Sequence, residues 1–143
     1  MVMANNFEIT EKDGGIRMKV WGRTVEELFS NALLGTAFYL KPEVAQMKKT
    51  ELKECQEIRV EAVDIVSLLV EFLSKVVEQS DMRGAVFSAI SFEEFGENFL
   101  EGKIFGAKAG ELENPIREVS FDEIDIRKNP DTYLYETVLM LEV

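Results

Sequence analysis

The sequence predicts an α+β fold in which two helices pack on one face of a mostly antiparallel or mixed β-sheet. Apolar residues recur at helical spacing over residues 25–40 and 65–79, on either side of a strand pattern at 56–61. After residue 84 the chain carries only strand patterns, over 86–95, 99–105, 116–127 and 132–143. With 143 residues and no repeat or linker, we expect one domain spanning residues 1–143.

The N-terminal region predicts a β-hairpin. Residues 7–10 and 16–21 have strand character, and the latter stretch alternates apolar Ile16, Met18 and Val20 with polar or aromatic neighbours. The segment 11–15 between them contains Asp-Gly, a pair that adopts the positive φ values of tight hairpin turns. We therefore expect the two strands to pair antiparallel.

Local signals mark where the helices begin. Gly22 ends the strand, and Thr24 followed by Glu27 is the capping-box pattern that satisfies free N–H groups in a first helical turn. Asp64 is the expected N-cap of the second helix, whose apolar stripe is wide enough to supply much of the core.

Composition excludes several classes of function. The chain has no histidine and one cysteine, Cys55, which excludes histidine-based catalysis, histidine-containing zinc sites and an internal disulfide. It has 16 basic and 27 acidic residues, a net charge of −11, so direct nucleic-acid binding is not expected. The acidic surface suits either solubility alone or docking onto a basic protein. With no signal sequence and no membrane-length apolar run, we expect a cytoplasmic protein.

Other candidate chemistry is weak. Glu93, Glu94 and Glu97 lie close together and suit either a general acid/base pair or, more simply, an exposed acidic edge. The glycines match no phosphate-binding loop, and no nucleophile–base pattern is visible. We expect a protein that is not an enzyme.

The phrase V-W-G-R-T-V-E-E-L-F-S-N-A at residues 20–32 resembles the opening of the archease family. Further similarity lies in A-V-D-I-V-S-L-L-V-E-F-L-S-K-V-V at 62–77, G-K-I-F-G at 102–106, I-R-E-V-S-F-D-E-I at 116–124 and the final L-M-L-E-V. Archeases are accessory proteins of the 3′-phosphate RNA ligase that joins tRNA halves. The resemblance implies an archease-like activator, with an RNA ligase or another protein as partner.

The chain departs from that family at a metal-binding loop. The family's Asp-His-Thr-Ala-Asp loop falls on residues 11–15, where Glu11 keeps the first carboxylate and Asp13 is a new one. Glu142 matches the family's acidic residue near the chain end. The resemblance implies that Glu11, Asp13 and Glu142 hold Ca²⁺, Mg²⁺ or Mn²⁺ through oxygen ligands. The alternative is a plain polar turn and a solvated terminal glutamate.

Arg117 is the candidate partner-binding residue. It keeps the positive charge of the family's Lys-Ala-Val-Thr-Tyr-His segment, which here reads R-E-V-S-F-D. The alternative is a surface charge paired with Glu113 or Glu118. A second function therefore stays open, a diverged protein-binding module on the same scaffold, without metal or ligase activation.

Overall fold

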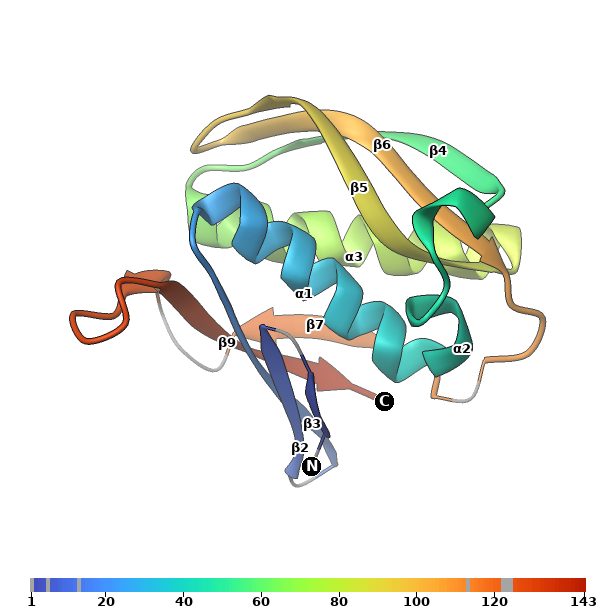
Figure 1. Cartoon of the computed structure of the whole chain (residues 1–143), viewed down its shortest axis with the longest axis horizontal. Coiled ribbons are helices and arrows are strands. Elements are labelled where there is room, and N and C mark those ends of the chain that lie inside the picture. Colours follow the sequence, from blue (N-terminus) through green and yellow to red (C-terminus); the bar gives the residue numbers. More distant parts are fainter. Residues whose placement is uncertain (1, 5, 13, 113, 122–124) are drawn as a thin grey trace.

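Two helices lie between two antiparallel sheets (Figure 1). The structure, a computed structural model, describes residues 2–4, 6–12, 14–112, 114–121 and 125–143. Helices α1 (Val25–Leu40) and α3 (Ile65–Arg83) form the middle layer and contact strands of both sheets. The α+β class is confirmed, and the strands divide into two sheets instead of the single sheet expected.

We call the sheet beneath the helices in Figure 1 the lower sheet. Within the described residues its strand order is β1-β2-β3-β9-β7, with β8 also paired to β9. These strands are β1 (Val2–Ala4), β2 (Phe7–Lys12), β3 (Gly15–Gly22), β7 (Glu118–Phe121), β8 (Arg127–Lys128) and β9 (Tyr135–Glu142). The pairing of β3 with β9 joins the two ends of the chain.

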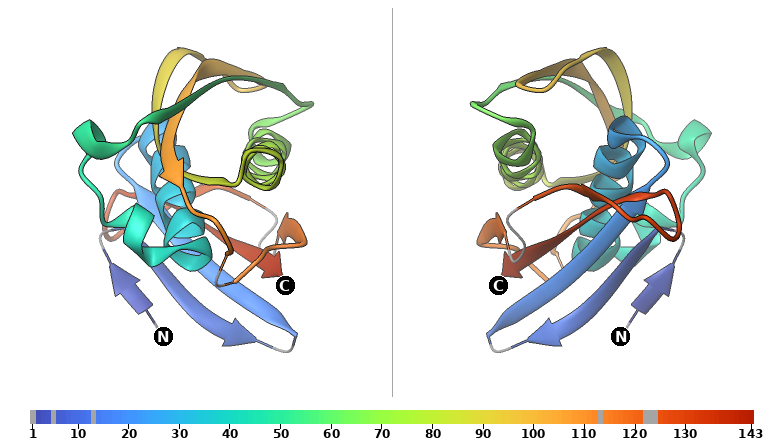
Figure 2. Two further views of the ribbon diagram at one scale, coloured as in Figure 1. Left: turned by 90° about the vertical axis from the view of Figure 1, so that its right-hand side faces the viewer. Right: turned by 90° about the vertical axis from the view of Figure 1, so that its left-hand side faces the viewer.

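The sheet above the helices is the upper sheet. Its strand order is β4-β6-β5 in the described part of the chain, with β4 at Glu54–Glu61, β6 at Phe99–Lys108 and β5 at Ala85–Phe95. Figure 2 shows it curving over both helices. The predicted hairpin at 86–95 and 99–105 is thus confirmed and extends to Lys108.

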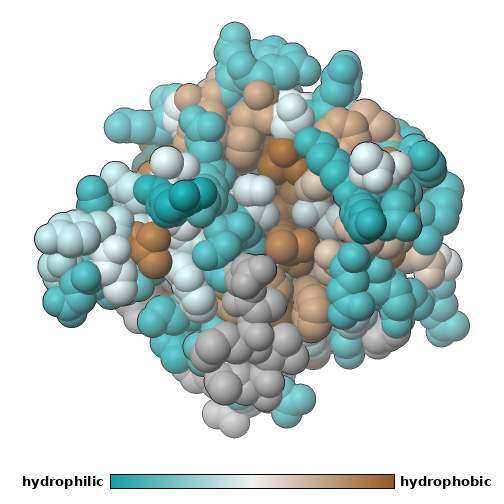
Figure 3. Space-filling view, viewed as in Figure 1, coloured by the Kyte–Doolittle hydropathy of each residue, from teal (hydrophilic) through white to brown (hydrophobic). Residues whose placement is uncertain are grey.

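The core fills both interfaces of the helical layer. From α3, the fully or almost fully buried apolar residues are Leu68, Leu69, Phe72, Leu73 and Val76. Burial of each large side chain contributes roughly 1.5–3 kcal/mol before conformational entropy is subtracted. The stacked rings of Phe29 and Phe72, 5.9 Å apart, join α1 to α3. On the face shown in Figure 3, hydrophilic side chains surround a strip of apolar ones over the middle of the molecule.

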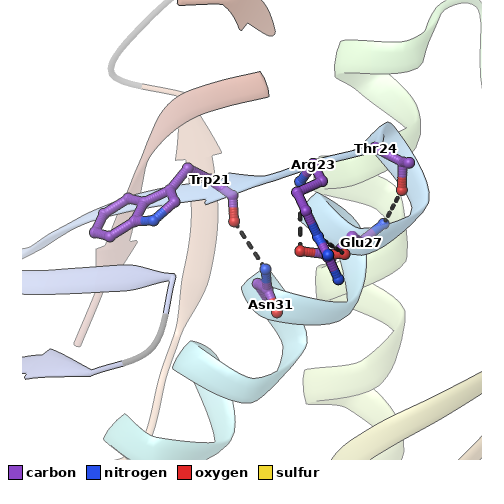
Figure 4. A network of polar contacts seen from close by, with 5 residues as sticks. All are labelled: Trp21, Arg23, Thr24, Glu27 and Asn31. Carbon is purple, nitrogen blue, oxygen red and sulfur yellow. Dashed lines mark hydrogen bonds and ion pairs between the residues drawn. The ribbon is translucent and has the colours of Figure 1, made fainter. Parts of the chain in front are cut away.

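The start of α1 is fixed by close contact and by a cap. Gly22 lies against the first turn so closely that a Cβ there would be 2.6 Å from the backbone nitrogen of Leu28. The Thr24 hydroxyl accepts a hydrogen bond from the Glu27 N–H at 3.0 Å, as predicted. The Glu27 carboxylate accepts from the N–H of Arg23 at 3.4 Å, one residue before the cap (Figure 4). The chain therefore turns sharply from β3 into α1.

The predicted start of the second helix is also confirmed. The Asp64 carboxylate accepts a 2.7 Å hydrogen bond from the Ser67 N–H and begins α3. Hydrogen bonds from the Ser67 and Val66 N–H groups hold the pKa of Asp64 below its usual value. The helix runs to Arg83, four residues beyond the predicted end, and Gly84 ends it with a φ of 60°.

Three further predictions differ from the structure. Glu11 and Lys12 belong to β2 and Gly15 belongs to β3, so these three residues lie in strands and not in the expected five-residue turn. The strand expected at 116–127 covers only β7 and the first residue of β8 in the described positions. A short helix α2 (Pro42–Ala45) and a 3₁₀ turn η1 (Lys49–Glu51) follow α1, where no helix was expected.

Candidate functional site

Glu11 lies on the face of the lower sheet that the helices cover. In the register it is opposite Ile16 of β3, and Ile16 is opposite Leu141 of β9; both of these residues are buried. Directly paired residues of an antiparallel sheet point to the same side. Glu11 itself is exposed, because its end of the hairpin extends past the last turn of α1.

A cleft of about 360 Å³ surrounds Glu11 at the end of α1. Its other lining residues are Ile9, Thr10, Ile16, Phe38, Tyr39, Pro42 and Asn114. Burial raises the pKa of the Tyr39 phenol, and the Glu11 carboxylate raises it further because a phenolate would be repelled. The side-chain amide of Asn114 donates a hydrogen bond to the Tyr39 carbonyl at 3.1 Å. This bond ties the segment between β6 and β7 to the end of α1.

Glu142 and Arg117 form an ion pair. The Arg117 Nη2 lies 3.3 Å from the Glu142 Oε2, and the Arg117 N–H donates to the Glu142 carbonyl. The Arg117 side chain is 75% exposed. Arg117 therefore pairs with Glu142 and not with Glu118, which lies opposite Glu142 in the register. Glu113 lies outside the described residues.

The structure does not bring Glu11 and Glu142 together. Glu142 pairs with Gly15 and so points to the outer face, whereas Glu11 shares the inner face with Leu141. The strands β2 and β9 are also two sheet spacings apart, about 10 Å. One ion needs oxygens within about 2.3–2.6 Å of it, so these two carboxylates do not fit a shared site.

The third predicted ligand, Asp13, lies outside the described residues. Among the residues that the structure does describe, no group of three His, Cys, Asp or Glu side chains is close enough to hold a metal ion. The divalent-metal site therefore stays a prediction, and Arg117 and Glu142 form the one pair of predicted site residues that the described structure joins.

The outer face of the lower sheet has a smaller hollow of about 220 Å³. The cations Arg17, Lys19 and Arg127 line it, together with the carboxylates of Asp125 and Glu136. This mixture of charge gives no purely basic surface of the kind that binds nucleic-acid phosphates. In the described part of the chain, no helix is long and apolar enough to span a membrane.

Comparison with known proteins identifies the family. The sequence model of the archease protein family matches residues 7–139, which include both long helices, the whole upper sheet, and the lower sheet except β1 and the last three residues of β9. The chain belongs to the archease family.

Relatives and solved structures agree with this assignment. A protein named archease from Thermococcus kodakarensis is 33% identical over 132 residues, which cover 87% of this chain and 90% of that protein. An archease from Pyrococcus abyssi is 27% identical with the same coverage.

Two solved structures show the same fold. The solution structure of a Methanobacterium thermoautotrophicum protein covers 96% of this chain and 99% of its own, with a TM-score of 0.73 at 19% identity. The crystal structure of a Thermotoga maritima archease, described as a possible chaperone, covers 94% of both chains with a TM-score of 0.62 at 13% identity.

The sequence prediction missed the cleft residues on α1. Phe38 and Tyr39 were assigned to the predicted helix without a separate role. Both are aromatic and lie in the last turn of α1, just before Pro42. This aromatic pair is the sequence signal for the cleft, where the two residues lie beside the end of the β2–β3 hairpin.

Proposed function

We propose that this chain is an accessory protein that binds and activates an RNA ligase in tRNA splicing or RNA repair in the cytoplasm. The family match over residues 7–139 carries the proposal, because it covers both long helices, the upper sheet and most of the lower sheet. The chain would act by docking onto the ligase. The name possible chaperone, given to the Thermotoga maritima archease, fits an assisting role.

Arg117 is the residue that we propose to contact the ligase. It lies at the start of β7, its side chain is largely exposed, and its pair with Glu142 holds the guanidinium at the sheet edge. An arginine held in one position loses little conformational entropy when it binds a second acceptor. A carboxylate or backbone carbonyl of the partner would supply that acceptor.

Affinity for the cognate 3′-phosphate RNA ligase tests this contact. Arg117→Glu should weaken the complex by about tenfold, equivalent to about 1.4 kcal/mol. Arg59→Glu is the matched control, because Arg59 is also exposed and ion-paired, to Glu61, but lies on the upper sheet. Neither change should affect folding, since exposed ion pairs contribute at most about 1 kcal/mol. Equal affinities for the two variants would contradict the role of Arg117.

The separation of Glu11 from Glu142 favours a second candidate, a protein-binding module that uses no metal. Calorimetric titration with Ca²⁺, Mg²⁺ and Mn²⁺ distinguishes a metal-dependent activator from this module, because the module would bind none of the three ions. We expect any saturable binding through Glu11 to be lost in Glu11→Gln and to survive in Glu142→Gln, because the two side chains lie on opposite faces. Loss of binding in both variants would show that the carboxylates share an ion and would contradict the geometry.

A further inference from the structure

A second surface lies at the opposite end of the molecule from the Glu11 cleft. It is a groove of about 560 Å³, lined by Val25, Val63, Asp64, Ile65, Phe95, Gly96, Glu97, Asn98, Ile126 and Tyr135. Val25 begins α1 and Tyr39 lies 14 residues later, so the two sites are about 21 Å apart along the helix axis. The right view of Figure 2 faces this end, where α1 and α3 begin and the β5–β6 hairpin projects.

Val63, the most exposed large apolar side chain in the described structure, lines this groove. Val63 is 87% exposed, although the chain around it is firmly held. The Ala62 N–H donates to the Asn98 carbonyl at 2.9 Å, and Asp64 caps α3 at 2.7 Å. Val63 is not isolated, because Val25, Ile65 and Phe95 line the same groove, and a contiguous exposed apolar patch is typical of an interaction surface.

The floor of the groove is pre-organised. The Phe95 ring packs edge-on against the buried Phe29 at 5.0 Å and against Phe92 at 5.1 Å. The turn beside it is closed by a 2.7 Å hydrogen bond from the Gly96 N–H to the Phe99 carbonyl. A partner that fills this groove therefore pays little ordering entropy on the side of this chain.

The rim beside this floor is acidic. Asp64 and Glu97 line the groove. Glu93 and Glu94 lie on the same hairpin, but Glu94 is paired with Glu101 and so points to the face of the upper sheet opposite to Phe95. All four are exposed, and none forms an ion pair within the described residues. On the opposite wall Lys128 lies over the Tyr135 ring at 5.6 Å, which leaves an excess of negative charge. The sequence left Glu93, Glu94 and Glu97 as either an acid/base pair or an exposed acidic edge; all three are exposed, and Glu97 lines this groove.

We propose that this groove docks a protein segment that carries apolar side chains next to lysine or arginine. The apolar residues would cover Val63 and Phe95, and the cations would face Asp64 and Glu97. The carboxylates repel nucleic acid and anionic lipid, and a second copy of a chain with net charge −11 would bring the same charges to the contact. The open shape suits a chain segment better than an enclosed small molecule.

Peptide titrations of the isotope-labelled full chain, followed by NMR, test the proposal. The probes are three synthetic peptides of equal length: one with leucine, phenylalanine and lysine, one with glutamate in place of lysine, and one with serine in place of the apolar residues. Only the first should give saturable shifts, at the amides of residues 63–65 and 95–98. Binding of the glutamate peptide with equal affinity, or shifts elsewhere, would overturn the proposal.

Matched variants separate the groove from general surface effects. Val63→Ser should weaken the binding of the first peptide by about tenfold. Met82→Ser, at a 69% exposed position near the far end of α3, should leave it unchanged. Glu97→Lys should weaken binding, whereas Glu78→Lys on the exposed side of α3 should weaken it less. Equal effects within either pair would overturn the assignment.

Sedimentation of the chain without peptide tests whether a second copy of the chain occupies the groove. We expect a monomer at the concentrations of the titration. Self-association that Val63→Ser abolishes would show that the groove binds a second copy, which would also overturn the proposal.

Discussion

Tyr39 offers a direct test of the cleft at the level of single residues. Its pKa is raised above the ordinary value of 10.0 first by burial and then by Glu11, so Glu11→Gln should lower this pKa without returning it to 10.0. Glu78→Gln, which also removes one carboxylate, should leave it unchanged. Phenolate absorbance measures the titration, and Tyr39→Phe identifies its contribution among the three tyrosines.

The sign of the linked stability follows from the direction of this shift. The folded state holds the Tyr39 phenol proton more tightly than the unfolded state does. The contribution of Tyr39 to the unfolding free energy is therefore fully present below about pH 10 and is lost as the pH rises through the pKa of Tyr39 in the folded state. The unfolding free energy should therefore fall less steeply above pH 10 in Glu11→Gln than in the unchanged chain. An identical slope for both proteins would show that Glu11 does not face Tyr39.

Glu11 also shows what the sequence could not predict about the site. A carboxylate at this position was identified from the family resemblance, but it was expected in a five-residue turn. The strand continues to Lys12, and the two-residue period then fixes Glu11 on the inner face and Glu142 on the outer one. Where Glu11 lies relative to Glu142 also depends on the pairing of β3 with β9, which are far apart in the sequence, and local patterns do not contain that pairing.

Gly22 tests the junction of β3 and α1 at the level of the element. A Cβ at this position would meet the Leu28 backbone nitrogen at 2.6 Å, so Gly22→Ala should destabilise the fold by about 1–3 kcal/mol. Gly96→Ala is the control, because its Cβ would meet only the Phe99 carbonyl oxygen at 3.7 Å. Urea denaturation measures both, and equal stability of the two variants would contradict the close contact.

The elements themselves were largely predictable because their signals are local. The bounds of α1 were predicted as observed, and both helix starts follow from the side chains of Thr24 and Asp64. The errors fall where tertiary contacts determine which strands pair. The division into two sheets depends on β3 pairing with β9 and β4 pairing with β6, each across long stretches of chain. Amphipathic patterns specify a buried face but not the strand beside it.

At the scale of the whole molecule, two surfaces lie at opposite ends of the same helical layer. One end holds the Glu11 cleft and the Arg117–Glu142 pair, and the other holds the apolar groove with its acidic rim. The core between them, with residues such as Phe29 and Phe72 fully buried, keeps both surfaces in fixed relation. The chain is therefore suited to contact a large partner at more than one point.

Ligation by the cognate 3′-phosphate RNA ligase under multiple-turnover conditions tests the central claim most directly. We expect substoichiometric amounts of this chain to raise ligase guanylylation and the amount of joined RNA, and Arg117→Glu to reduce that gain more than Arg59→Glu. Unchanged guanylylation and turnover at every ratio of chain to ligase, with the chain shown to be folded, would contradict the account.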